Sequence, residues 1–464
     1  MAKMVTNKTV TSVDILNSLR NELSADYRDK VPVAGTDAAS IRAIGQILTF
    51  NPGLMNEFYE ALVNRIGRVV ITNKMWKSAI SEWVDYGTLD YGDIVEDIFI
   101  SLIDPSLYDP NESYANVEKI EKADVYATFY VINMKLKYKT TTSPELIARA
   151  FTSAEGVNDL IERVIGQLFN SYEYDKFQII KYLIAYNLIN GRIKNTVVSA
   201  LTASTSDAFV TSLKGLSNQF EFMTEGYNVI NEPYFATKDD QWLVINAKSD
   251  AIVDVATLAA AFNMDKATFA GHKIMIDSFG NLNVDRLDKI MAGNPNYHRF
   301  TADELQTLDE TVYAVLMGRN YIKAIQALNR ATARFNEDGL YTNNWLHVWE
   351  SYSTSAYELA TVFTSLTPSI DSVSLTIASS GASTGTIDAG GVDQVLVTVD
   401  NDGTFASKAV KFTSSNSDAL KVDYLGNIFV PETFSTADTS VTVTATSVED
   451  STKSASVTFT VNPS

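Results

Sequence analysis

The amino-acid sequence predicts an α+β protein that ends in a separate all-β sandwich. The first observation is a helical pattern over residues 152–190, where apolar side chains recur every three or four positions. The second is a series of short β-like runs from about residue 369 onward, separated by Gly, Asp and Asn turns. The third is a change in composition, because Trp, Met, His and Arg all occur before residue 367 and none occurs after it. Two parts with different cores therefore meet near Pro368.

The overall composition narrows the possible functions. A chain of 464 residues with 45% hydrophobic residues can bury two or three sizeable cores. The formal net charge of -19 argues against a broad surface built to neutralise phosphates. The absence of cysteine excludes disulfides, thiolate nucleophiles and thiolate zinc sites.

The residues before the long helix predict an arm followed by an extended excursion. Residues 1 to about 60 alternate short helical patterns with turns, "FYEALVNRIGRVVITNKMW" then passes from helical spacing to a β-rich run, and residues from about 75 to 142 have an extended pattern. In "VINMKLKYK" apolar and polar residues alternate, which places Lys135, Lys137 and Lys139 on one face of a strand. An acidic stretch precedes this strand and contains Asp85, Asp90, Asp93, Glu96 and Asp97. Acidic and basic segments in one long, turn-rich excursion predict a protruding loop.

The long helix and the region after it predict an α/β unit. Thr152 and Glu155 have capping-box spacing, and Asn190-Gly191 supplies a C-terminal stop. After the helix, "DQWLVIN" and "HKIMIDSF" predict strands. "VDVATLAAAFNM" and "TVYAVLMGRNYIKAIQALNRA" predict helices, and "LYTNNWLHVWESYSTSAYELATVF" predicts a late strand.

The sequence contains no recognisable reaction centre. Phosphate-binding glycine loops, the H-E-x-x-H zinc motif and the G-x-S-x-G nucleophile motif are all absent. The three histidines His272, His298 and His347 are scattered, and His347 alternates with Trp345 and Trp349 as in a packed aromatic strand. No catalytic, cofactor-binding or metal-binding residues are predicted, which favours a structural protein over an enzyme.

Several stretches together resemble the major capsid proteins of small tailed phages of the phi29-like podovirus kind. They are "LVNRIGRVVI" (62–71), "FTSAEGVNDLIERVIGQLFNSYEYDKF" (151–177), "VDVATLAAAFNMDKATFAGHKIMIDSF" (253–279) and "WLHVWESYSTSAYELATVF" (345–363). The later "KFTSSNSDALKVDYLGNIF" is similar to a bacterial Ig-like domain of group 2, with which phi29-like capsid proteins end. The resemblance follows the family's order over nearly the whole chain.

The resemblance implies a Hong Kong 97-type phage capsid fold for residues 1–367 and an Ig-like β-sandwich for residues 368–464. Within the capsid domain it implies an N-arm and the start of the P-domain (1–74), an E-loop (75–142), the P-domain spine helix (143–194), a mainly A-domain region (195–335) and a closing P-domain strand (336–367).

The implied function is that of a self-assembling major capsid protein without enzymatic activity or cofactors. Its copies would form pentamers and hexamers of an icosahedral or elongated shell, with a scaffolding protein and a portal or connector as assembly partners. The shell would enclose double-stranded DNA without specific binding, and no membrane is implied. The Ig-like domain is a possible host-surface contact. The expected location is the virion, after assembly in the host cytoplasm.

The predicted subunit contacts are the lysine row Lys135, Lys137 and Lys139 and the acidic residues Asp90, Asp93, Glu96 and Asp97. We expect the lysines to face acidic groups, within the loop or on an adjacent subunit, rather than the genome.

Two other functions stay open on the sequence alone. One is a secreted or surface carbohydrate-binding protein, or a hydrolase, with an appended Ig-like module. The N-terminal "MAKMVTNKTVTSVDILNSLRNEL" lacks the apolar run of a signal peptide, which disfavours this alternative. The other is a tail or fibre component, for which longer β-repeats are expected.

Overall fold

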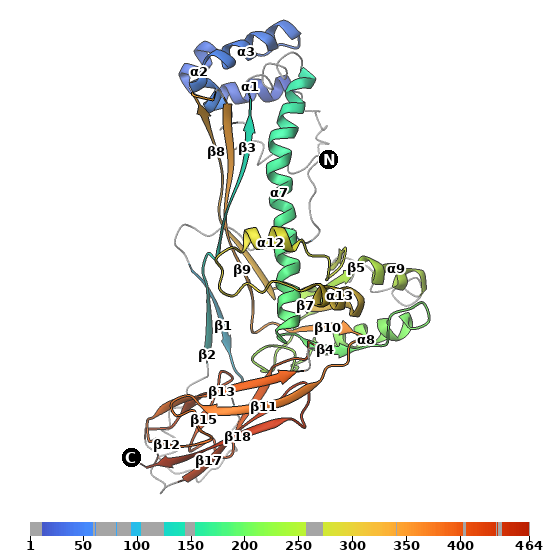
Figure 1. Ribbon diagram of the computed structural model, residues 1–464, viewed down its shortest axis with the longest axis vertical. Helices are drawn as coiled ribbons and strands as arrows, with labels where there is room; N and C mark the ends of the chain where they lie inside the picture. Colours follow the sequence, from blue (N-terminus) through green and yellow to red (C-terminus); the bar gives the residue numbers. More distant parts are fainter. Residues whose placement is uncertain are drawn as a thin grey trace, which may run out of the picture. The chain divides into compact units, whose positions relative to one another are not determined.

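The computed structural model describes most of the chain, in two compact units. The described residues are 12–58, 61, 80, 94–103, 125–143, 154–256, 272–339, 341–401, 405–432, 434 and 439–463. The first unit comprises Met1–Ile94, Val131–Ile179 and Ala324–Tyr352, and the second comprises Val95–Tyr130, Ile180–Lys323 and Ser353–Ser464. Figure 1 shows the course of the chain through these units.

Three N-terminal helices and a three-stranded sheet form the core of the first unit (Figure 1). The helices are α1 (Ser12–Glu22), α2 (Ala25–Lys30) and α3 (Ala38–Phe50), and the strands run in the order β3 (Met134–Thr142), β9 (Tyr341–Thr354) and β8 (Ile322–Asn336). The Ser24 and Asp37 side chains accept hydrogen bonds from backbone N–H groups at the starts of α2 and α3, as N-caps do. Leu48, Phe58 and Leu346 are buried in the shared core, so helices and sheet stabilise each other.

The long helix is α7 (Ala154–Ile189), which contributes to both units and contains 36 residues. At 1.5 Å per residue it is about 54 Å long. It ends in a Schellman motif, in which the N–H of Gly191 donates to Leu188 and the N–H of Arg192 donates to Asn187. Gly191 has a φ of 65°, and a Cβ there would lie 2.4 Å from the carbonyl oxygen of Ala406, so this position requires glycine.

A five-stranded mixed sheet forms the centre of the second unit. Its order is β4 (Lys194–Val197), β10 (Ala360–Thr364), β7 (Val312–Gly318), β5 (Gln241–Asn246) and β6 (Lys273–Ile276). The helices of this unit include α8 (Ser206–Gln219), α9 (Ala247–Ala256), α12 (Val284–Ile290) and α13 (Ala302–Thr311). Phe209 of α8, Leu316 of β7 and Phe363 of β10 pack in one core, which fixes α8 on the sheet.

The helix predicted over residues 311–331 is wrong. This stretch forms the whole of β7, a turn at Arg319 and Asn320, and the first part of β8. Strand β7 lies between β10 and β5 and is buried along nearly its whole length, so it reads as a continuous apolar run. Periodicity cannot separate such a strand from a buried helix, and sheet pairing overrides the helix propensity of its Ala, Leu and Met residues.

The last part of the predicted loop, over residues 134–142, forms strand β3. β3 pairs antiparallel with β9 over its whole length, from Met134 opposite Glu350 to Thr142 opposite Thr342. β3 therefore belongs to the three-stranded sheet. The sequence places it beside the acidic stretch, but its hydrogen-bonding partner comes from a strand about 200 positions later.

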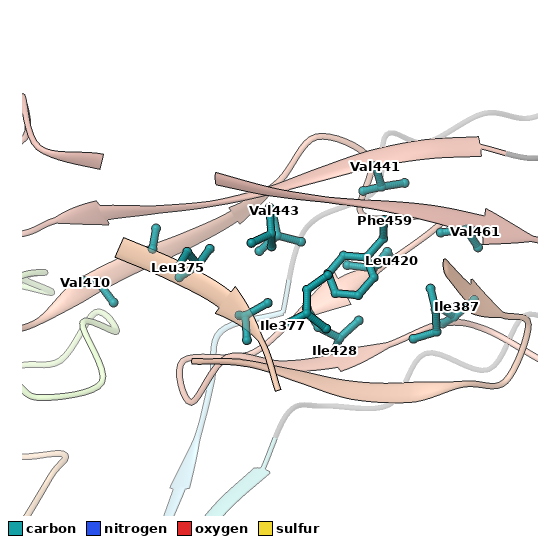
Figure 2. Close-up of a cluster of buried hydrophobic side chains, with 14 of the residues drawn as sticks. Leu375, Ile377, Ile387, Val410, Leu420, Ile428, Val441, Val443, Phe459 and Val461 are labelled. Carbon is teal, nitrogen blue, oxygen red and sulfur yellow. The ribbon is translucent and has the colours of Figure 1, made fainter. Parts of the chain in front are cut away.

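The C-terminal strands form a β-sandwich of two four-stranded sheets. One has the order β11 (Ile370–Ile377), β13 (Val392–Asn401), β16 (Asn427–Phe429) and β15 (Lys421–Val422), and the other has the order β12 (Thr384–Asp388), β18 (Ser454–Asn462), β17 (Thr439–Ser447) and β14 (Val410–Ser414). Figure 2 shows Leu375, Ile428 and Phe459 in the core between them. Val, Ile, Leu and Ala side chains and Phe459 form this core, with Phe412 and Phe434 packed against it. Trp and Met, which are absent after residue 367, are not needed to fill it.

Candidate subunit-contact surfaces

Two strands of the second unit form an antiparallel ribbon with two different faces. The strands are β1 (Val95–Ile100) and β2 (Val125–Tyr130), paired from Val95 opposite Tyr130 to Ile100 opposite Val125. Because side chains alternate along a strand, odd-numbered residues of β1 and even-numbered residues of β2 share the inner face. The remaining residues share the outer face.

A buried ion pair anchors the inner face of the ribbon. The carboxylate of Asp97 lies 2.5 Å from Nζ of Lys323, which is 8% exposed. The hydroxyls of Ser355 and Tyr130 also donate to Asp97, at 3.0 and 3.3 Å. Lys323 in turn lies 5.0 Å from the centre of the Tyr130 ring. This network of charged and hydrogen-bonded groups fixes the ribbon to its own chain.

Aromatic packing continues the inner face. The ring of Phe99 stacks on Tyr357 with centroids 5.3 Å apart and lies 5.9 Å from Tyr234. Thr128 and Tyr357 share a hydrogen bond of 2.8 Å between their hydroxyl oxygens. The ring of Tyr126 meets Tyr424 of the sandwich edge-on at 4.6 Å. Both ion pairing and aromatic burial therefore hold this face in place.

Glu358 is a buried acid beside the same ion pair. Its burial raises the pKa to about 7, an effect that the nearby Lys323 opposes and that the carboxylates of Asp97 and Asp240 reinforce. The carboxyl group of Glu358 therefore holds a proton up to about pH 7, whereas an exposed glutamate is ionised above about pH 4.5.

The outer face of the ribbon is apolar and exposed. It consists of Glu96 and four large apolar side chains, with exposed fractions of 57% for Ile98, 62% for Ile100, 56% for Val125 and 61% for Phe129. Large apolar side chains that gather on one exposed face mark a site of interaction with another protein. We call this set of five residues together with Ala127, which lies opposite Ile98, the ribbon outer face.

The lysine row lies on the exposed side of β3. Lys135, Lys137 and Lys139 are all exposed, as the alternation predicts, and the residues between them are at least half-buried. Opposite them on β9 are Trp349, His347 and Trp345. Nζ of Lys135 lies 4.7 Å from the centre of the Trp349 ring, and Nζ of Lys139 lies 5.9 Å from that of Trp345. These are cation–π distances, so two of the lysines contact aromatic rings of their own chain.

Strand β8 adds two arginines to this side of the sheet. Ala331 is buried in the core of the unit and Ala333 packs against it. Their neighbours Arg330, Thr332 and Arg334 therefore point to the opposite side. Thr332 hydrogen-bonds His347 at 3.0 Å, which places them on the same side. The sheet outer face is thus defined by Lys135, Lys137, Lys139, Arg330, Thr332, Arg334, Trp345, His347 and Trp349.

The buried carboxylate of Glu350 is hydrogen-bonded to side chains of its own chain within the packed interior. Glu350 is 4% exposed and accepts hydrogen bonds from the hydroxyls of Tyr172 and Tyr352 and from the amide of Gln326. Burial and the neighbouring Glu350 raise the pKa of both tyrosines well above the usual value. His298 binds Glu304 at 3.1 Å, apart from this network. Within the described ranges, no three His, Asp or Glu side chains are placed to hold a metal ion.

A comparison with protein families identifies the chain. Residues 16–364 match the model of the family described as "Phi29-like phage major capsid protein". The chain belongs to this family. The major capsid protein of Bacillus phage GA-1 is 27% identical over 357 residues, which cover 76% of this chain and 69% of the relative. That of Streptococcus phage Cp-1 is 29% identical over 288 residues, which cover 59% and 78%.

The protein is therefore a structural component of a phage capsid and is located in the virion. The alternative of a secreted carbohydrate-binding protein or hydrolase is not favoured by these matches. The structure is also similar to a chain of the "Capsid structure of Staphylococcus phage Andhra", with a TM-score of 0.49, 12% identity, and 63% of this chain and 86% of that chain covered. No helix among the described residues is both long and apolar enough to cross a membrane.

The predicted contact residues of this capsid protein fall in different environments. The three lysines lie on the sheet outer face and Glu96 lies on the ribbon outer face. Asp97 instead points inward to Lys323. Because Asp97 and Glu96 are adjacent in a strand, their side chains point to opposite faces. Asp90 and Asp93 lie outside the described residues.

Sequence reasoning did not find the ribbon outer face or the two arginines. For the ribbon, "VEDIFI" and "VYATFY" each alternate, but both of their faces contain apolar residues, so the pattern does not identify the exposed one. For the arginines, "NRATARF" alternates with period two, and this signal was hidden by the prediction of a helix.

Proposed function

We propose that copies of this capsid protein assemble by packing the ribbon outer face of one copy against another copy. The observation that carries this proposal is the exposure of Ile98, Ile100, Val125 and Phe129 on a single face of an anchored ribbon. Covering these side chains contributes roughly 1 kcal/mol each before the entropic costs of association. Repeated in many copies, such modest contacts are sufficient to close a shell.

The anchoring of the ribbon supports this role. A strand pair that is held by Asp97, Lys323 and Phe99 presents its outer residues without a further ordering cost. Glu96 supplies one charge on this face, where a basic group of the neighbouring copy would pair with it. Lys135, Lys137 and Lys139 form a second candidate contact, with an anionic partner.

The fold and its partners are part of the same proposal. We assign the core to the Hong Kong 97-type fold, with α7 as spine helix, the ribbon in the E-loop and the five-stranded sheet in the A-domain. We assign the C-terminal sandwich to the Ig-like class, which two packed four-stranded sheets support. We further propose that the copies form pentamers and hexamers and that a scaffolding protein and a portal take part in assembly. The shell encloses double-stranded DNA, and the C-terminal sandwich contacts the host surface.

The experiment combines expression of the full chain with its phage's scaffolding protein and negative-stain electron microscopy. The unaltered chain is expected to form shells tens of nanometres wide. The double variant Ile98→Asp/Phe129→Asp should fold but fail to form shells, because two buried carboxylates oppose the contact.

A matched control is Phe222→Asp, since Phe222 is 71% exposed and lies outside the ribbon. This control should still form shells. Normal shells from the double variant would contradict the proposed contact, whereas the absence of shells from the unaltered chain would contradict assembly with scaffolding protein alone.

A further inference from the structure

We propose that the sheet outer face binds the phosphate backbone of the enclosed double-stranded DNA, without reading its sequence. The inference rests on the proposed function in one respect, namely that the shell encloses DNA. It differs from the sequence prediction that the lysines face acidic protein groups, because the structure joins those lysines to cations from a distant strand.

The charge of this face is opposite to that of the chain. Lys135, Lys137, Lys139, Arg330 and Arg334 contribute five positive charges. The strand positions described on the same face of the sheet contain no Asp or Glu. The whole chain carries -19, so its other surfaces repel a polyanion on balance. A local positive face on such a chain selects the side that DNA can approach.

The spacing of the cations suits a polyanion with closely spaced charges. Alternate residues of a strand are about 7 Å apart, so the lysine row extends about 14 Å. The two arginines are on β8, two strands away from β3, which places them about 10 Å to the side. A DNA duplex carries about one negative charge per 1.7 Å of its axis. Several phosphates therefore lie within reach of the row in any register along the duplex, as contact without sequence specificity requires.

The tryptophans hold part of the lysine row in place. Lys135 and Lys139 lie over Trp349 and Trp345, at 4.7 and 5.9 Å from the ring centres. A free lysine side chain loses more conformational entropy than most other side chains when it is immobilised. The aromatic contacts limit this freedom before DNA arrives, so less of the binding energy is lost on ordering.

The residue types favour DNA over a second copy of the protein as the partner. Lysine is depleted in the cores of protein interfaces, where aromatic residues, Met and Arg are enriched. The two tryptophans of the sheet outer face are half-buried, and Lys135 and Lys139 lie over their rings. The ribbon outer face has an apolar composition, whereas the sheet outer face has three exposed lysines with no large aliphatic side chain between them on the same side of β3. The lysine ammonium group is a compact point charge that binds a phosphate without the fixed bidentate geometry of arginine, which suits phosphates in variable positions.

The test measures binding of the purified full chain to a fluorescently labelled 30-base-pair duplex of arbitrary sequence, by anisotropy at several salt concentrations. Phosphate contacts by the three lysines and Arg334 predict a slope of about -3.6 for the logarithm of affinity against the logarithm of salt. The triple variant Lys135→Gln/Lys137→Gln/Lys139→Gln should bind at least about tenfold more weakly at low salt and lose about 3 from that slope. Shells of this variant, formed with scaffolding protein, should be normal.

The control variant is Lys248→Gln/Lys289→Gln/Lys421→Gln, which removes the same charge from exposed positions elsewhere in the chain. It should keep the slope of the unaltered chain. Equal slopes for the two triple variants, or no binding by the unaltered chain at low salt, would overturn the inference. If the lysine triple variant forms no shells but binds DNA as the unaltered chain does, the inference is overturned in favour of a contact between copies. Whether the unaltered chain forms shells tests the proposed capsid assembly separately.

Discussion

The ribbon outer face and the sheet outer face are built alike but differ in chemistry. Each is the exposed side of strands whose other side is packed on its own chain. Exposed positions of the ribbon hold Ile98, Ile100 and Phe129, whereas those of the sheet hold lysines and arginines. The difference teaches that alternation fixes which residues face outward, and that residue type then decides which partner the face suits.

The two faces also differ in how firmly they are attached. The ribbon depends on one buried ion pair and a few aromatic contacts, while the sheet shares a core with three helices and α7. Substitutions beneath the ribbon should therefore have larger effects on stability than substitutions on either exposed face.

The largest expected effect comes from two phenylalanines on opposite faces of the ribbon. Phe99 is 7% exposed and Phe129 is 61% exposed. Phe99→Ala should lower the free energy of unfolding by about 3 kcal/mol, because it empties a packed site. Phe129→Ala should change it by less than about 0.5 kcal/mol. Urea unfolding of the unassembled chain measures both, and equal losses would mean that the two faces are not distinct.

The next effect tests the ion pair beneath the ribbon. Asp97→Asn leaves Lys323 buried without its carboxylate and should cost about 3 kcal/mol. Glu96→Gln, the neighbouring change on the outer face, should cost less than about 0.5 kcal/mol. Limited proteolysis and urea unfolding report the loss. A stable Asp97→Asn protein would show that the ribbon is held by its aromatic contacts alone.

The pH dependence of stability distinguishes the buried side of the ribbon from its outer face. The folded chain raises the pKa of Glu358 from 4.5 to about 7, so between these values it binds a proton that the unfolded chain releases. Stability should therefore fall as the pH rises from about 4.5 to 7, by about 1 to 3 kcal/mol relative to Glu358→Gln. Thermal unfolding across this range measures the difference. Parallel curves for the two proteins would contradict it, and Glu96→Gln is the exposed control.

The smallest effect concerns the sheet outer face. Lys135→Gln and Lys139→Gln each remove a cation–π contact and should cost about 0.5 kcal/mol. Lys137→Gln is the internal control, since Lys137 lies opposite His347, and its effect should be near zero. Urea unfolding of the three single variants in one buffer compares them. Losses above 2 kcal/mol would mean that the row stabilises the fold rather than serving a partner.

Local patterns in the sequence determined much of this fold. The spacing of apolar residues predicted α7 within two residues at each end, and Asn190-Gly191 predicted its stop. Alternation predicted that Lys135, Lys137 and Lys139 share an exposed face. The change in composition after residue 367 and the short runs with turns predicted the C-terminal strands. Each of these features depends on residues that are close together in the chain, so a short window contains the whole signal.

Only the tertiary structure decided the features that join distant segments. Pairing within the five-stranded sheet made β7 a strand despite its helix-forming residues. Asp97 and Glu96 are equally acidic in sequence, and the packing of the inner face, with Lys323 and Ser355 against Asp97, decides which of them points inward. Arg330 and Arg334 join the lysine row because β9 lies between β3 and β8. The physical reason is that burial and charge neighbourhood are properties of packed surfaces, which sequence positions about 200 residues apart build together.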